Sequence, residues 1–131
     1  MELYRSKFKH TEYDEKLSLL ANYWTDAIMR DKDFQDEILA WVDLAKKYKP
    51  KNLLADTTLF NYTISTEMQT WTNEVVFPQL VAAGAKKFAV IMHPDIITQL
   101  SLEQTMEESE AAALQNQFFG LVAEAIEWFK Q

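Results

Sequence analysis

Apolar and polar residues follow one another along this chain in a pattern typical of strands that alternate with helices. Short apolar runs predict strands, and apolar residues at steps of three and four predict helices. The predicted strands cover residues 2–8, 17–24, 52–56 and 87–92, and residues 114–119 are either a fifth strand or helical. The predicted helices cover residues 34–48, 66–83, 95–106 and 121–129. This order predicts one α/β domain, residues 1–131, with a mixed sheet of four or five strands and about four helices.

The direction of the strands follows from the lengths of the connections. The first two strands are joined by a polar segment, residues 10–16, with a turn at Asp14-Glu15. We predict that they pair as an antiparallel hairpin, whereas the later strands, separated by helices, run parallel. The third helix carries the apolar residues Ile96, Ile97, Leu100 and Met106.

Several residues are suited to helix ends. Asp33 is expected to cap the first helix, and Ser65 or Thr66 the second. Pro78 should kink the second helix. Gly84 should end it in a left-handed conformation.

Composition excludes several kinds of site. The chain has 131 residues but only two glycines, Gly84 and Gly120, which lie too far apart for a phosphate-binding or dinucleotide-binding loop. It has no cysteine, so neither disulfides nor thiolate metal sites are available. Neither His10 nor His93 has a second histidine at ligand spacing, so we expect no metal and no cofactor. No apolar run approaches the roughly 20 residues of a membrane span, and we expect a cytoplasmic protein.

Negative charge is concentrated in the last third of the chain. The formal net charge is -7, and no lysine or arginine lies between Lys87 and Lys130. That stretch holds Asp95, Glu103, Glu107, Glu108, Glu110, Glu124 and Glu127. Such a surface disfavours nucleic acid as a partner. It is either a solvated face or a docking surface for a basic protein partner.

Three segments carry a resemblance to a known family. They are the strand 52–56, residues 82–90 leading into the next strand, and the ending Phe118-Phe119-Gly120 followed by residues 125–128. Together with the order of elements, they resemble the STAS domain, the fold of bacterial anti-sigma-factor antagonists. The related SpoIIAA-like branch has a fold often compared with CRAL-TRIO lipid-binding domains. The resemblance implies a regulatory domain that acts through protein contacts, or a carrier of a small apolar molecule.

The resemblance also implies a phosphorylation site. In the antagonists, an acid ends the third strand, and an Asp-Ser-Ser-Gly motif opens the next helix. Asp56 matches the strand-end acid, and Ser65 in Ile64-Ser65-Thr66-Glu67 is the nearest match to the phosphorylated serine. Ile64 and Glu67 stand where the motif has its acid and its glycine.

The candidate site residues follow two predicted strands, where parallel sheets bind ligands. They are Asp56, Thr57, Thr58, Ser65, Thr66 and His93. Three hypotheses apply to them: capping and loop hydrogen bonds, a phosphoacceptor at Ser65, or a triad of Asp56, His93 and a hydroxyl in a small hydrolase.

The tryptophans offer a further candidate site. Each lies on a predicted apolar face, so core packing is the default. If Trp24 and Trp71 are exposed, they would form an apolar patch for a protein or an apolar small molecule. The sequence therefore predicts a non-enzymatic interaction domain, with an apolar-ligand carrier and a hydrolase using His93 as alternatives. A second copy of the chain is a further candidate partner.

Overall fold

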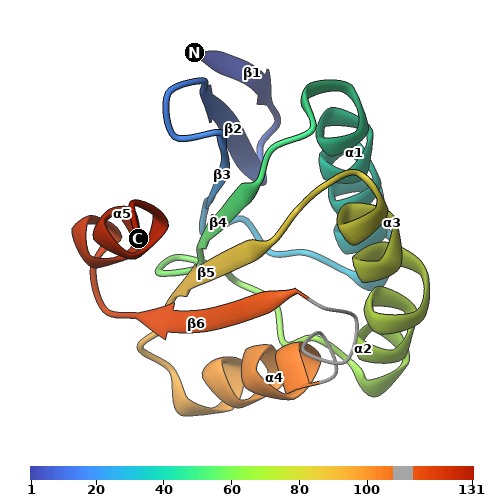
Figure 1. Cartoon of the computed structure of the whole chain (residues 1–131). Helices are drawn as coiled ribbons and strands as arrows, with labels where there is room; N and C mark the ends of the chain where they lie inside the picture. The colour runs from blue at the N-terminus through green and yellow to red at the C-terminus, as the bar shows by residue number, and fades with distance from the viewer. Residues whose placement is uncertain (108–113) are drawn as a thin grey trace.

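The computed structural model describes residues 1–107 and 114–131, which form a six-stranded sheet flanked by helices (Figure 1). The strands are β1 (Glu2–Arg5), β2 (Lys9–Asp14), β3 (Leu19–Trp24), β4 (Asn52–Asp56), β5 (Lys87–Ile91) and β6 (Gln115–Phe119). The helical segments are α1 (Asp31–Tyr48), α2 (Thr66–Trp71), the π-helical turn η1 (Thr72–Val76), α3 (Phe77–Ala82), α4 (Ile96–Met106) and α5 (Val122–Phe129).

The strands lie in the sheet in the order in which they occur in the chain. β1, β2 and β3 form an antiparallel meander, and β3 to β6 are parallel neighbours. The carboxyl ends of the four parallel strands therefore meet at one edge of the sheet, called the carboxyl edge below. The helical connections between these strands all advance in the same direction along the sheet. Because such connections share one handedness, their helices lie on the same face of the sheet.

The two faces of the sheet carry separate apolar clusters. The larger cluster joins α1, α3 and α4 to one face, with Leu20, Leu53 and Phe88 of the strands at its centre. The smaller cluster packs Ala125 and Phe129 of α5 on the other face. Central strands covered on both sides explain the continuous apolar run of β5, whose residues 88–91 are all buried.

The sheet has six strands, so the prediction of four or five was wrong, although the α/β class and the mixed sheet are confirmed. The additional strand is β2, in the segment predicted to be a polar connection. Its inward positions include Lys9 and Thr11, both fully buried. Because polar residues occupy both faces of this strand, its buried and exposed positions do not appear in the sequence as alternating apolar and polar residues. β3 accordingly pairs with β2 rather than with β1, and the turn at Asp14-Glu15 joins β2 to β3.

The expected helix ends are mostly confirmed. Ser65 is the N-cap of α2, and its Oγ accepts a hydrogen bond from the Met68 amide at 3.2 Å. Gly84 has a φ of 111° and follows the end of α3. Asp33 is not the N-cap of α1; that residue is Arg30, whose amide donates to the Asp33 carboxylate at 3.0 Å.

The helical segment 66–82 is irregular close to Pro78, where a kink was predicted. Pro78 has no amide hydrogen for the helical ladder, and the π-helical turn η1 immediately precedes α3, in which Pro78 lies. The disturbance therefore takes the form of a widened turn ahead of the proline.

Candidate functional site

Asp56 and the two threonines after it form a local turn at the end of β4. The Asp56 Oδ1 accepts hydrogen bonds from the Thr58 amide at 3.1 Å and from the Thr58 hydroxyl at 2.6 Å. The Thr57 side chain is buried, and its hydroxyl donates to the Ile91 carbonyl oxygen at the end of β5. Thr57 therefore ties two strand ends together, and Asp56 holds the loop that follows.

A surface cleft of about 520 Å³ lies beside Asp56 at the carboxyl edge. It is lined by His10, Tyr23, Trp24, Thr25, Asp26, Asp56, Thr58 and Leu59. The rings of His10 and Tyr23 stack with centroids 5.0 Å apart. Burial and the charges of Glu12 and Asp56 raise the pKa of Tyr23. With two carboxylates and no lysine or arginine in the lining, the cleft disfavours phosphate and other anions.

Ser65 does not line this cleft and lies where the segment before α2 meets α4. Besides capping α2, it is half-buried next to Ile64, whose amide donates to the Ser101 Oγ of α4 at 3.2 Å. Thr66 is exposed in the first turn of α2, followed by Glu67.

His93 is engaged in the turn between β5 and α4. Its Nδ1 accepts a hydrogen bond from the Asp95 amide at 2.9 Å, and its own amide donates to the Gln99 Oε1 at 2.9 Å. Within residues 1–107 and 114–131, no hydrogen bond joins His93 to Asp56 or Ser65. The three residues of the hydrolase hypothesis are not assembled into a triad.

The two candidate tryptophans do not form an exposed pair. Trp24 is only 6% exposed and packs edge-on against Phe60. Trp71 is half-buried and packs against Phe34. Core packing, the default interpretation, describes both side chains.

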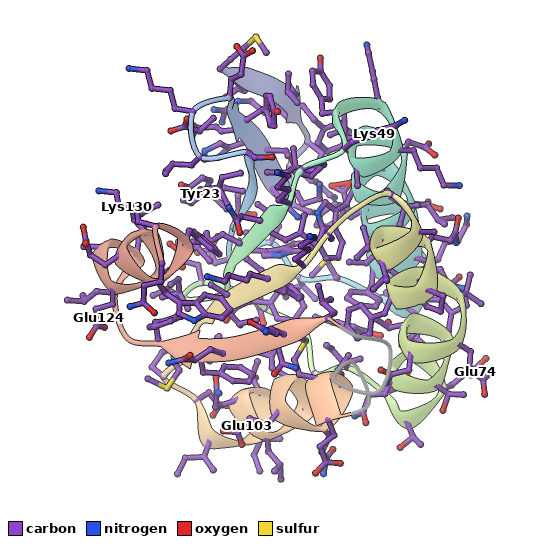
Figure 2. All side chains as sticks on the ribbon, viewed as in Figure 1. Tyr23, Lys49, Glu74, Glu103, Glu124 and Lys130 are labelled. Carbon is purple, nitrogen blue, oxygen red and sulfur yellow. The ribbon has the colours of Figure 1, made fainter. Side chains whose placement is uncertain are left out.

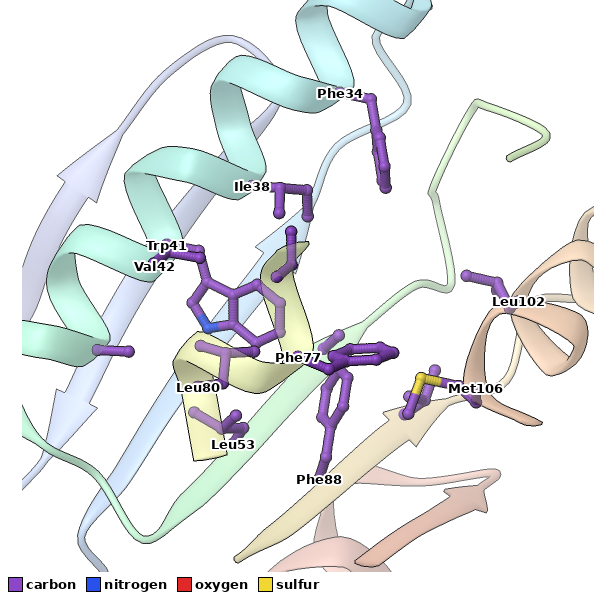
Figure 3. Close-up of a cluster of buried hydrophobic side chains, with 14 of the residues drawn as sticks. Phe34, Ile38, Trp41, Val42, Leu53, Phe77, Leu80, Phe88, Leu102 and Met106 are labelled. Atoms are coloured by element: carbon purple, nitrogen blue, oxygen red, sulfur yellow. The ribbon is translucent and has the colours of Figure 1, made fainter. Parts of the chain in front are cut away.

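Trp24 instead helps to line a small apolar cavity inside the larger cluster. The cavity has a volume of about 60 Å³, and its lining includes Phe34, Trp41, Phe77 and Phe88, shown in Figure 3. The threonine hydroxyls of the lining donate to backbone carbonyl oxygens, as Thr72 does to Met68, and the Asn22 side-chain oxygen accepts hydrogen bonds from Lys9 and Thr11.

The outward face of α4 was not recognised from the sequence. The sequence pattern gave Ile96, Ile97 and Leu100 as apolar residues of this helix, and they are 80%, 63% and 48% exposed. The buried side of α4 carries Thr98, Ser101 and Thr105 together with Leu102 and Met106. Figure 2 shows carbon-rich side chains projecting from α4 away from the sheet. We call Ile96, Ile97 and Leu100 the α4 ridge.

Hydroxyls can occupy the inner face of α4 because the helix itself satisfies them. The Ser101 Oγ donates to the Thr98 carbonyl oxygen and the Thr105 Oγ1 to that of Ser101, each at 2.7 Å. The spacing of Thr98, Ser101 and Thr105 is as helical as that of the ridge. That second stripe was the signal in the sequence that α4 had two candidate inner faces.

A second group missed from the sequence lies under the N-terminal meander. The Lys9 ammonium is fully buried and donates to the Thr11 Oγ1 at 3.0 Å and to the Asn22 Oδ1 at 3.2 Å. It also lies 4.4 Å from the centre of the Tyr4 ring. Burial lowers the pKa of Lys9 to about 8, opposed by the charge of Glu37. The buried Glu37 carboxylate accepts hydrogen bonds from the Tyr4 and Ser6 hydroxyls.

Groups of three or more metal-ligating side chains are absent from the described residues. None of the helices in this part of the chain is long and apolar enough to cross a membrane. Comparison of the chain with protein-family models, curated proteins and solved structures gave no match. The STAS resemblance therefore stays a prediction.

Proposed function

We propose that this chain is a non-enzymatic protein-interaction domain of the STAS type that contacts its partner through the α4 ridge. The observation that carries the proposal is the exposure of three large apolar side chains at neighbouring positions of one helix. Single exposed apolar side chains are common, but contiguous ones mark interaction surfaces. The proposal does not require phosphorylation of Ser65.

The chemistry of α4 supports this proposal. The helix carries three hydroxyl residues on its buried side, beside Leu102 and Met106, and aliphatic residues on its exposed side. Folding alone gains little from that arrangement, since the stabilisation by burial is proportional to the apolar area removed from water. A partner that covers the α4 ridge would supply the missing burial.

Photo-crosslinking in the native cells tests the proposal. A benzophenone amino acid at position 97 or 100 should give a discrete crosslinked product. The same group at Leu39 of α1 or Val75 of η1, which are 43% and 41% exposed, should not. Products of equal yield at all four positions, or none at the ridge, would contradict the proposal.

A second candidate function, the carriage of an apolar small molecule, is favoured by the aromatic cavity. Its volume of about 60 Å³ is well below the roughly 150 Å³ of a cavity that binds benzene. It would therefore hold only a molecule of a few heavy atoms. Native mass spectrometry of protein purified without detergent should show the added mass, and a bare mass in every preparation would count against carriage.

A further inference from the structure

The outward stripe of α4 changes from apolar to acidic along the helix. Ile96 and Leu100 are followed on the same stripe by Glu103 and Glu107, at helical steps of three and four. Both glutamates are exposed, and Glu103 is labelled on α4 in Figure 2. The α4 ridge and these two carboxylates form one continuous strip along the helix.

The acidic end of the strip has no balancing charge from the described residues. The Glu103 Oε1 accepts only a 3.4 Å hydrogen bond from the Gln99 amide group, and neither glutamate has an ion pair there. Lys87 and Lys130, the nearest cations before and after this stretch of the sequence, both interact with α5 instead. Lys87 donates to the Trp128 carbonyl oxygen, and Lys130 pairs with Glu127 at 3.3 Å.

This charge selects among the molecules that could cover the strip. A second copy of the chain would offer no cation to Glu103 and Glu107, because its own strip carries the same two carboxylates and no lysine or arginine. An anionic lipid surface would be repelled by these carboxylates. A protein segment with apolar side chains next to lysine or arginine complements both ends of the strip.

We infer that the occupant of the strip is a basic amphipathic helix of a partner protein. Its apolar face packs on the α4 ridge, and its cationic side chains pair with Glu103 and Glu107. A helix fits because α4 offers a straight strip about 16 Å long, and side-chain ridges of one helix fit the grooves of another. The inference rests on the proposed function and adds the class of partner.

A synthetic probe tests this class directly. The probe is a helical peptide of leucine and lysine, about 18 residues long, with leucines at steps of three and four. Its references are a leucine–glutamate peptide of the same pattern and a scrambled leucine–lysine peptide. In amide NMR spectra of the whole chain, the probe should shift residues of α4 and leave α1 unchanged. The two reference peptides should bind at least tenfold more weakly.

Substitutions at exposed positions measure separately what the apolar end and the acidic end of the strip contribute to binding of the probe. Ile97→Gln should weaken the probe at least tenfold, and Glu103→Gln with Glu107→Gln at least threefold, with a smaller dependence on salt. Glu67→Gln with Glu74→Gln, which removes two exposed acids from α2 and η1, is the control and should have little effect. Equal binding of the glutamate peptide, or shifts centred outside α4, would overturn the inference.

The crosslinking experiment distinguishes this inference from the proposed function. If crosslinks form at the α4 ridge but the lysine peptide fails, the partner is not a basic helix and the docking surface stands. If the crosslinked product is a dimer of the chain, a second copy is the occupant and the inference is wrong. If ridge crosslinks also fail, the proposed function falls with it.

Discussion

Lys9 is the residue whose environment differs most from that expected of its type. Among the described residues, its ammonium has only neutral hydrogen-bond partners, Thr11 and Asn22, while the buried carboxylate of Glu37 binds Tyr4 and Ser6 instead. A buried charge without a direct ion pair costs stability. The lowering of its pKa from 10.5 to about 8 corresponds to a cost of about 3 kcal/mol.

Replacing this charge should stabilise the protein. At pH 7, Lys9→Met should raise the free energy of unfolding by about 1–3 kcal/mol, because methionine fills the site without a charge. The pKa of Lys9 is lower in the folded chain, so the cost is complete below pH 8 and fades as the pH rises towards 10.5. The advantage of the variant should shrink over the same range.

Urea unfolding at several pH values measures this difference. Tyr4, whose pKa is raised by burial and by its hydrogen bond to Glu37, is present in both proteins, so its titration largely cancels. Lys16→Met, at an exposed position, is the control and should change stability by less than about 0.5 kcal/mol. A destabilised Lys9→Met protein at pH 7 would show that the ammonium supports the fold.

The two glycines give a matched pair of substitutions. Gly84 has a φ of 111°, and its amide donates to the Val81 carbonyl oxygen at 3.0 Å, whereas Gly120 does not have a positive φ. A methyl group at position 84 would meet no atom within 4 Å, so Gly84→Ala isolates the backbone effect. It should cost about 1 kcal/mol or more, while Gly120→Ala should be nearly neutral. Equal thermal midpoints for the two variants would refute this explanation.

At the scale of elements, α4 is joined to the segment before α2 by one hydroxyl. Ser101 accepts from the buried Ile64 amide and donates within its own helix, whereas the Thr105 hydroxyl donates only within α4. Ser101→Ala should therefore cost about 1–3 kcal/mol, because it leaves a buried amide unpaired. Thr105→Val should cost less than about 1 kcal/mol. Chemical denaturation compares them, and a neutral Ser101→Ala would contradict the assigned contact.

At the scale of the whole molecule, α5 is the one helix among the described residues that covers the face of the sheet opposite α1 and α4. Phe129→Ala should therefore cost about 3 kcal/mol, since it removes a buried ring from the smaller cluster. Glu127→Ala, on the exposed side of α5, should cost less than about 1 kcal/mol. If Phe129→Ala unfolds no more easily than Glu127→Ala, the smaller cluster is not a stabilising core.

The sequence predicted elements best where burial is uniform. β4 has the predicted bounds, 52–56, because Leu53, Leu54 and Ala55 are covered on both faces. β2 was not predicted because Lys9 and Thr11 are buried polar residues, and the periodicity of a sequence cannot distinguish buried polar residues from solvated ones. For α4, the pattern gave the helix but not its rotation, since aliphatic and hydroxyl stripes both had helical spacing. The candidate residues Asp56, Thr57 and Ser65 were correctly predicted to lie at or next to the ends of a strand and a helix. Where they lie relative to one another depends on the course of the loop between those elements, which no local sequence pattern encodes.

If the proposed function is correct, the α4 ridge binds a protein partner. The most direct measurement is the affinity of the crosslinked partner, once expressed and purified, for the wild-type chain and for Leu100→Gln. We predict that the dissociation constant rises at least tenfold for Leu100→Gln and stays unchanged for the control Leu39→Gln. Equal affinities of the wild-type and Leu100→Gln chains for that partner would contradict the claim.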